Sequence, residues 1–163
     1  SELYDPKNKG LYNWKHRGGI MENFDKDYED GNNIEKLVLN LILKKYPKAY
    51  IKEGYFKGWD IHIPEVDKTV EVKFDRVAET GKNILIEIES NNEPSGMSTT
   101  KADFWVIYDN VKFYWFKTEQ IRKCIYENKL DWREYKANQD KKLKKAYMIN
   151  KELLLKYKLN KQK

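Results

Sequence analysis

Residues 58–75 read GWDIHIPEVDKTVEVKFD, and the apolar side chains of this stretch recur at every second position. Such alternation predicts two consecutive strands, Trp59 to Pro64 and Thr69 to Asp75. Successive side chains of a strand point to opposite faces, so each strand has an apolar face for packing and a polar face. The polar faces carry Asp60 in the first strand and Glu71 and Lys73 in the second.

Period-two alternation continues on both sides of this stretch. It predicts a strand at Tyr50 to Phe56 before it and a strand at Asn83 to Ser90 after it. In the latter, Glu87 and Glu89 alternate with isoleucines. Turn residues separate the four segments, so we expect a largely antiparallel meander. Two further strands are predicted at Phe104 to Tyr108 and Val111 to Phe116.

Helices are predicted before and after the strands. Apolar residues recur with helical spacing from Asn33, and Pro47 follows the end of that helix. A shorter helix is expected from Thr118, as its N-cap, through Tyr126, and an amphipathic helix at about Asp140 to Leu159. We interpret residues 1–32 as loop and short turns, and expect one helical turn near Ser98 to Asp103. The order of elements predicts an α/β or α+β domain with a mixed sheet.

The 163-residue length is typical of a single domain. We divide it into an N-terminal extension (1–32), a core (33–117) and C-terminal helices with a basic tail (118–163). The apolar stretches are too short to cross a membrane, and charged residues make up 36% of the chain. The polar N-terminal residues and the lone Cys124 lead us to expect a cytoplasmic, reducing location.

The net charge of +6 is unevenly distributed. Residues 131–163 contain eleven Lys and Arg against four Asp and Glu, a net +7, which leaves −1 for the remainder. A basic segment of this kind suits binding to a phosphate backbone, because each cation placed near a phosphate releases a counterion. A solvated amphipathic helix with a lysine tail explains the same pattern equally well.

The polar faces of the three central strands could bring carboxylates together. If the strands are neighbours, Asp60, Glu71, Glu87 and Glu89 converge around Lys73. Carboxylates in such a group repel one another, and hard oxygen ligands suit Mg²⁺ or Mn²⁺. Lys73 could orient or deprotonate a water there and screen a phosphate. An antiparallel sheet with one solvated face is the alternative.

The order of these residues resembles the PD-(D/E)XK nuclease superfamily. Glu35 lies in the first helix, Asp60 in the following strand, and Glu71-Val72-Lys73 comes ten residues later. A longer stretch, EVKFDRVAETGKNILIEIESNNEPSGMSTTKADFWVIYD at residues 71–109, resembles small phage-encoded nucleases of this superfamily. One departure is that Trp59, rather than a proline, precedes Asp60.

The resemblance implies a restriction-endonuclease-like αβββαβ core, a mixed central sheet flanked by helices, here followed by the basic C-terminal helical segment. Asp60, Glu71 and the carbonyl of Val72 would bind Mg²⁺, with Mn²⁺ able to substitute. Lys73 would position and activate the attacking water, and Glu35 would assist through the water shell of the metal. Hydrolysis of a DNA phosphodiester would follow. Either Glu87 or Glu89 could add a metal ligand.

Other polar residues are candidates for contacts with the nucleic acid. They are hydroxyls near a predicted helix start and cations at strand ends or in the basic segment. Each group has a competing explanation. The hydroxyls could simply cap a short helix, the cations at strand ends could be ordinary exposed charges of a hairpin, and the lysines of the basic segment could form a solvated helix face. The candidates are Arg76, Lys82, Thr99, Thr100, Lys101, Lys141, Lys142, Lys144 and Lys145.

Three functions remain open from the sequence. The first is a Mg²⁺-dependent deoxyribonuclease, which would act in a host cytoplasm if it is phage-encoded. The second is a nucleic-acid-binding module on a nuclease-like fold without catalysis. The third is a junction resolvase acting as a homodimer.

Overall fold

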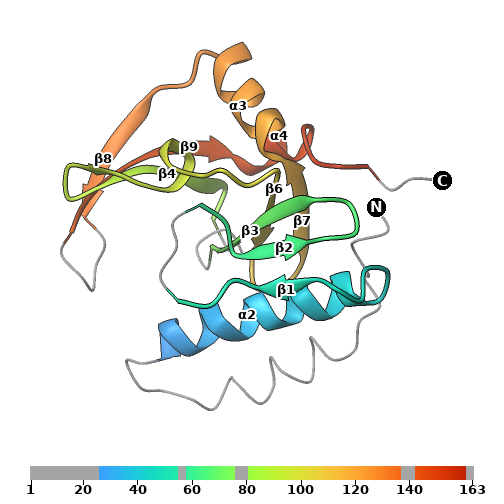
Figure 1. The fold of residues 1–163 in the computed structure, drawn as a ribbon. Coiled ribbons are helices and arrows are strands. Elements are labelled where there is room, and N and C mark those ends of the chain that lie inside the picture. The colour runs from blue at the N-terminus through green and yellow to red at the C-terminus, as the bar shows by residue number, and fades with distance from the viewer. Residues whose placement is uncertain (1–25, 55–57, 76–80, 137–141, 161–163) are drawn as a thin grey trace.

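The structure is a computed structural model that describes residues 26–54, 58–75, 81–136 and 142–160. These residues form a mixed α/β arrangement of two sheets with few helices (Figure 1). In chain order the elements are α2 (Lys26–Leu43), β1 (Tyr50–Ile51), β2 (Ile61–Ile63), β3 (Lys68–Phe74), β4 (Asn83–Ser90), β5 (Glu93–Pro94), the 3₁₀ turn η2 (Gly96–Ser98), β6 (Phe104–Tyr108), β7 (Phe113–Lys117), α3 (Thr118–Glu127), β8 (Trp132–Lys136), β9 (Leu143–Asn150) and α4 (Lys151–Leu155).

The first sheet has the strand order β1-β2-β3-β6-β7 and is mixed. β3 runs parallel to β6, with Val70 opposite Phe104 and Phe74 opposite Tyr108, while the other neighbours are antiparallel. Helix α2 lies along one face of this sheet (Figure 1). Ile34 and Val38 of the helix pack with Ile61 and Val70 of the strands in one core cluster. This packing places the helix next to the strand that carries Glu71 and Lys73.

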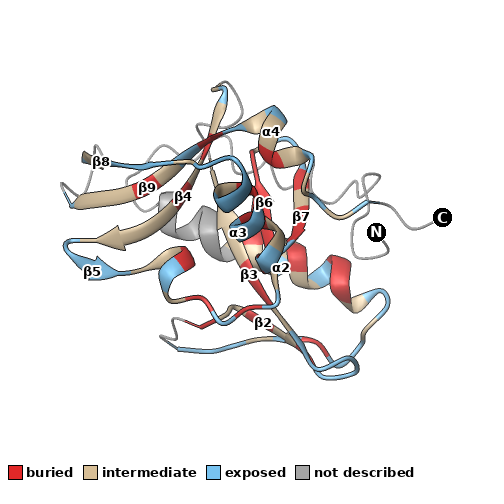
Figure 2. Cartoon of the chain, turned by 90° about the horizontal axis from the view of Figure 1, so that it is seen from above, coloured by how far each residue is buried: buried red, intermediate tan, exposed pale blue. Residues whose placement is uncertain are grey.

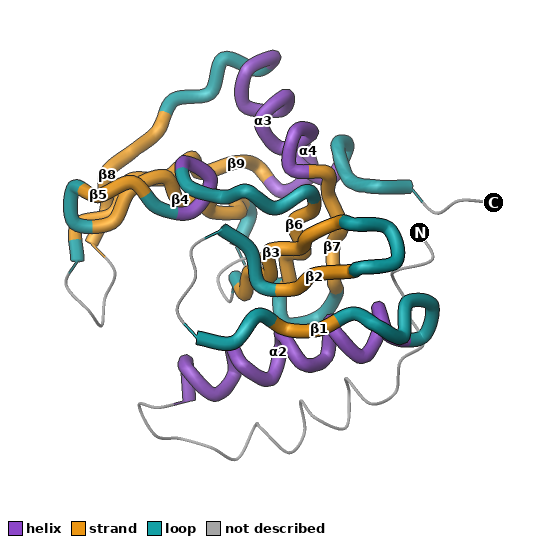
Figure 3. Tube along the Cα trace, in the orientation of Figure 1, coloured by secondary structure: helices purple, strands orange, loops and turns teal. Residues whose placement is uncertain are grey.

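β4 does not continue the meander that the sequence predicts. It pairs with β5 and β9 in a second, antiparallel sheet of order β5-β4-β9-β8. Figure 3 shows this sheet beside the first one. The reason is that β6 already occupies the edge of β3 that a meander would have offered to β4. The carboxylate of Asp75, just after β3, accepts a hydrogen bond of 3.0 Å from the Leu85 N–H and so links the sheets.

A second core fills the space between the two sheets and the C-terminal helices. Buried side chains from β6 and β7 meet those of β4, β9, α3 and α4, and the buried segments are marked in Figure 2. These residues, which are fully or nearly fully buried, are Trp105, Ile107, Phe116, Ile84, Ile86, Ile149, Ile121, Cys124 and Leu154.

The predicted C-terminal helix is wrong. Residues 143–150 form strand β9, and only the short helix α4 follows it. β9 pairs with β4 from Asn83 opposite Asn150 to Ser90 opposite Lys144, which buries Ala146 and Ile149. An unpaired edge of β4 would leave backbone groups without partners, so tertiary pairing outweighs the helical spacing. The neighbouring strand β8 was not predicted.

Smaller differences concern the element ends. α2 begins at Lys26 rather than Asn33. β1 is shorter than predicted and ends at Ile51. Lys117, not Thr118, is the N-cap of α3, since the Thr118 hydroxyl donates to the Ala102 carbonyl instead. No helix among the described residues is both long and apolar enough to cross a membrane.

Candidate active site

Asp60 lies immediately before β2, between the chain after β1 and strand β3. Its N–H donates to the Val70 carbonyl (2.9 Å), and its Oδ2 accepts from the Val72 N–H (2.7 Å). The carboxylate therefore takes the position beside β3 that a longer β2 would fill. The N–H and C=O of one strand residue point to the same side, so the Val72 carbonyl also faces Asp60. Backbone hydrogen bonds to β3 thus fix the position of Asp60 relative to the Val72 carbonyl.

Glu71 and Lys73 project from β3 on the face away from α2. Their neighbours Val70, Val72 and Phe74 pack in the core beneath the helix, and strand alternation turns the two charged residues the other way. Glu71 is only 8% exposed. Lys73 Nζ lies 3.9 Å from Glu71 Oε1 and 5.5 Å from the centre of the Trp105 ring. The lysine is therefore held over β6 beside a nearly buried carboxylate.

Glu35 reaches the same group from α2. Burial of Ile34 and Val38 in the first core sets the rotation of the helix, and Glu35 comes within hydrogen-bonding distance of the Asp60 side chain. The four residues that the sequence predicts as catalytic, Glu35, Asp60, Glu71 and Lys73, therefore meet in one place.

The grouped carboxyls hold their protons more tightly than usual. Burial, followed by the charge of Asp60 and a hydrogen bond with it, raises the pKa of Glu35 to about 7, although Lys73 opposes the shift. Burial, followed by the hydrogen bond with Asp60, raises the pKa of Glu71 to about 9. At neutral pH the group therefore keeps protons in place of a full negative charge. A divalent cation is the natural replacement for those protons.

A polar cleft of about 460 Å³ opens in front of this group. One wall is formed by Asp60, Glu71 and Lys73 of the first sheet. The opposite wall comes from β4, the β4–β5 turn, η2 and the start of β9. Its lining residues are Glu87, Ser90, Asn91, Glu93, Pro94, Ser95, Gly96, Thr99 and Lys142.

Glu87 is held in place on the second wall. Its Oε2 accepts a 2.7 Å hydrogen bond from the Ser95 hydroxyl, and its Oε1 lies 3.1 Å from Lys144 Nζ. Gly96 packs directly against it with φ +52°, and a Cβ at this position would clash with the Glu87 carbonyl oxygen. Only glycine allows η2 to approach β4 this closely.

Glu87 and Glu89 are placed differently. Register shifts between them in the pairing of β4 with β9, so simple alternation does not relate the two side chains. Glu89 pairs with Lys145 (3.0 Å), whose ammonium also lies 4.7 Å from the centre of the Trp132 ring. Of the two glutamates, Glu87 lines the cleft and Glu89 does not.

The predicted nucleic-acid contacts are scattered. Thr99 and Lys142 line the cleft, and Lys144 stands behind Glu87. Thr100 is buried and accepts a 3.1 Å hydrogen bond from the Trp105 indole, so its role here is structural. Lys101 is exposed next to it. Lys82 lies at the opposite end of β4 from Glu87, and Arg76 and Lys141 lie outside the described residues.

Several residues of the second wall were not predicted. Ser90, Asn91, Glu93 and Ser95 reach the cleft because β4 and β5 form a tight hairpin. Asn91 and Asn92 both have positive φ, of 53° and 63°, as the Asn-Asn pair in the sequence could have indicated. The sequence could not show that this hairpin folds over Glu71.

The residues of the cleft fit a magnesium ion chemically. No three His, Cys, Asp or Glu side chains in the described part of the chain are arranged to hold a metal alone. Mg²⁺, however, is usually held by one or two carboxylates with waters and substrate phosphate. Asp60, Glu71 and the Val72 carbonyl offer that donor set, and burial, the main cause of the raised pKa values of Glu35 and Glu71, disfavours the ionised carboxyls that a bound cation would stabilise.

Comparison of the chain with protein-family models, with curated proteins and with solved structures finds no match.

Proposed function

We propose that this protein is a Mg²⁺-dependent nuclease that hydrolyses phosphodiester bonds of DNA. The observation that carries the proposal is the meeting of Glu35, Asp60, Glu71 and Lys73, from α2, the start of β2 and β3. The last three of these residues line an open polar cleft. The same four residues carry the resemblance to the PD-(D/E)XK nucleases.

The order of elements supports a restriction-endonuclease-like core as part of this proposal. A helix, three strands and then a strand parallel to the third are present as α2, β1, β2, β3 and β6. The segment between β3 and β6 departs from the expected pattern, because it contains β4, β5 and the single 3₁₀ turn η2 in place of a longer helix. The departure adds the second wall of the cleft and leaves the β3 site unchanged.

In this proposal Asp60, Glu71 and the Val72 carbonyl would hold the metal. The bound Mg²⁺ would supply charge to stabilise the phosphoryl oxygens and lower the pKa of a bound water. Lys73 Nζ, beside Glu71 at the cleft wall, would orient the attacking water and offset the charge of the phosphate. Glu35, whose pKa is raised to about 7, can accept a proton near neutral pH. The attacking water would lose a proton as its oxygen bonds to phosphorus, the P–O bond to the leaving oxygen would break, and that oxygen would take up a proton from solvent.

The decisive test is cleavage of linear, nicked, single-stranded and branched DNA, and of RNA, with Mg²⁺ and with EDTA. We expect Mg²⁺-dependent cleavage that Asp60→Asn and Lys73→Ala each reduce by roughly 100-fold or more. Lys112→Ala, which removes an exposed lysine from the β6–β7 turn, is the control and should cleave normally. Full activity in Lys73→Ala would refute the assignment. Salt-dependent binding without any cleavage would instead indicate a binding module.

A further inference from the structure

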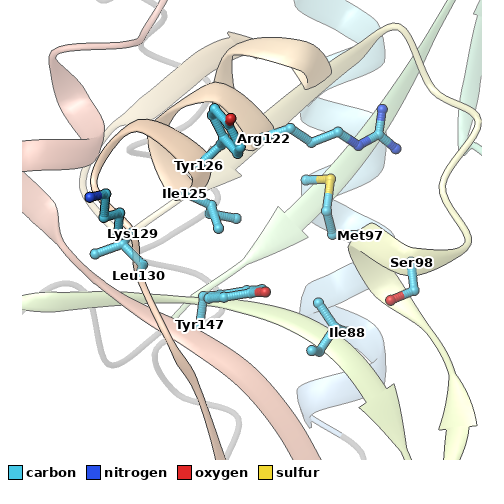
Figure 4. Close-up of a pocket in the computed structure, with 9 residues that line it drawn as sticks. All are labelled: Ile88, Met97, Ser98, Arg122, Ile125, Tyr126, Lys129, Leu130 and Tyr147. Carbon is cyan, nitrogen blue, oxygen red and sulfur yellow. The ribbon is translucent and has the colours of Figure 1, made fainter.

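A second, apolar groove of about 520 Å³ opens between α3 and the second sheet. Figure 4 shows side chains from both elements and from η2 facing the same space. Ile88 and Met97 contribute apolar surface on one side, and Ile125 and Leu130 on the other. The rings of Tyr147 and Tyr126 complete the lining (Figure 4). The groove therefore offers a ligand an apolar surface that includes two aromatic rings.

The groove also presents hydrogen-bonding groups that nothing in the described structure uses. The hydroxyls of Ser98, Tyr126 and Tyr147 have no hydrogen-bond partner among the described residues. A ligand that fits must therefore combine a flat apolar body with polar edges. A nucleobase has both features, whereas an aliphatic side chain has only the first.

The charged groups of the lining are both cationic. Arg122 pairs with Glu119 on α3, and Lys129 has no ion-pair partner in the described part of the chain. No carboxylate lines the groove. Cations at the rim of an aromatic groove suit a base whose backbone phosphate stays outside.

The apolar groove adjoins the carboxylate cleft through η2. Glu87, Gly96 and Thr99 line the cleft, whereas the neighbouring residues Ile88 and Met97 line the groove. One short turn therefore separates the two sites. A single nucleic-acid strand could place a phosphate in the cleft and a nearby base in the groove by crossing that turn.

We propose, on the basis of the nuclease function proposed above, that this groove receives an unpaired nucleobase close to the scissile phosphate. A base inside a duplex is stacked and paired and cannot enter a groove of this kind without leaving the helix. The preferred substrate is therefore nucleic acid with single-stranded or unpaired nucleotides at the cleavage position.

The test measures binding without metal, so that it does not depend on cleavage. Three labelled DNA duplexes are compared by fluorescence anisotropy in EDTA: one fully paired, one with a single unpaired nucleotide, and one with an abasic residue in place of that nucleotide. We expect the unpaired base to bind roughly fivefold or more tightly than the abasic residue, the range of one base–aromatic stack. Equal binding of the three duplexes would overturn the inference.

Variants of Tyr126 assign the preference to the groove. The side chain is 85% exposed, so its removal should leave the fold intact. Tyr126→Ala should remove most of the preference for the unpaired base, and Tyr126→Phe should retain it. Met148→Ala, an exposed residue next to Tyr147 in β9 that does not line the groove, should behave as wild type. A preference that survives in Tyr126→Ala would refute the role of the groove.

The two proposals can fail separately. Preference for the unpaired base without Mg²⁺-dependent cleavage would refute the nuclease function alone. Mg²⁺-dependent cleavage without that preference would refute the groove inference alone. An amphipathic peptide that binds the wild type but not Tyr126→Ala, with equal binding of the three duplexes, would assign the groove to a protein partner and overturn the inference.

Discussion

At the scale of single residues, the dominant feature is a group of acids held together at an energetic cost. Glu35 and Glu71 have raised pKa values because burial and the nearby Asp60 carboxylate both disfavour the ionised forms. Carboxyls with pKa values shifted by burial and mutual repulsion are typical of a site where the protein binds a charged ligand.

The raised pKa values predict how stability depends on pH. The two carboxyls are protonated in the folded protein at pH values where an unfolded chain has lost the protons, above the ordinary value of 4.5. The folded state therefore binds more protons, and stability without metal should fall as pH rises from about 4.5 to about 9. Thermal unfolding across this range in EDTA measures the effect.

A Glu71→Gln variant separates this effect from general alkaline destabilisation. It should be more stable than wild type by about 1–3 kcal/mol near pH 8 in EDTA. The reason is that folding of the wild type at this pH requires Glu71 to take up a proton, whereas the glutamine is always neutral. Near pH 4 the two proteins should differ little. Mg²⁺ should stabilise wild type but not the variant, and equal stabilisation of both would contradict the proposed metal ligand.

Gly96 is the residue on which the second wall of the cleft depends. Gly96→Ala should destabilise the protein by about 1–3 kcal/mol in chemical denaturation, because the new Cβ meets the Glu87 backbone. Gly54→Ala is a matched control, since Gly54 also has positive φ, +80°, but open space around it. Equal loss of stability in the two variants would show that φ, and not the contact with Glu87, sets the cost.

At the scale of elements, strand β4 separates two environments. Its isoleucines Ile84 and Ile86 lie in the second core, while Glu87 lines the carboxylate cleft. β9 holds this strand in place through backbone pairing and the Lys144–Glu87 and Lys145–Glu89 ion pairs. The basic residues of β9 therefore contribute to the architecture of the cleft as well as to its charge.

Helix α4 is fixed to the β6–β7 turn through Asp109. This carboxylate is 2% exposed and accepts hydrogen bonds from Lys151 Nζ (2.6 Å), the Tyr114 hydroxyl and the Lys112 and Val111 N–H groups. Burial acts to raise the pKa of Asp109, but the hydrogen bonds, with that of Lys151 the strongest, outweigh it and lower the pKa below 3.8. Asp109 therefore joins the two elements as a carboxylate.

Asp109→Asn should destabilise the protein by about 1–3 kcal/mol in denaturant unfolding, because it removes the charge of a nearly buried carboxylate that accepts four hydrogen bonds. The lowered pKa means that the Asp109 contribution is present above pH 3.8 and is lost as pH falls through the lower folded value. Asp131→Asn, at an exposed position, controls for the loss of one charge. A change below 1 kcal/mol in Asp109→Asn would indicate that the amide replaces the carboxylate fully.

At the scale of the whole molecule, the cleft lies between the two sheets. The first sheet and α2 provide the acids and Lys73, and the second sheet provides Glu87 and Lys142 on the other wall. The basic residues of the C-terminal segment that the structure describes are spread over β8, β9, α4 and the chain that follows, and among them they do not form one helical face. The charge that faces the cleft from this segment is that of Lys142 and, behind Glu87, Lys144.

This arrangement predicts the salt dependence of DNA binding. If Lys142 contacts a phosphate, Lys142→Ala should weaken binding for all sequences and reduce the slope of log K against log salt by about 1. Lys158→Ala, which removes an exposed lysine after α4, should leave the slope unchanged. Titrations at several salt concentrations in EDTA measure both slopes. Equal slopes for wild type and Lys142→Ala would place the phosphate elsewhere.

Local pattern was sufficient for much of the first sheet and for the faces that carry Asp60, Glu71 and Lys73, whereas Glu35 was predicted only from the resemblance to the PD-(D/E)XK nucleases. The alternation in residues 58–75 predicts β2 and β3, and the helical spacing after Asn33 predicts the packed part of α2. Alternation also predicts that Glu71 and Lys73 share a face. These features depend on side-chain periodicity within one element, which a sequence records directly.

Tertiary structure alone decided which elements became neighbours. β4 pairs with β9 and not with β3, because β6 fills the edge of β3 in parallel register. That choice converts a segment with helical spacing, residues 143–150, into a strand and brings Glu87 to face Glu71. Strand pairing satisfies backbone groups over long sequence separations, and no local spacing records it. The local pattern thus determined which strand faces carry Asp60, Glu71 and Lys73, and the tertiary pairing determined the cleft that these residues line.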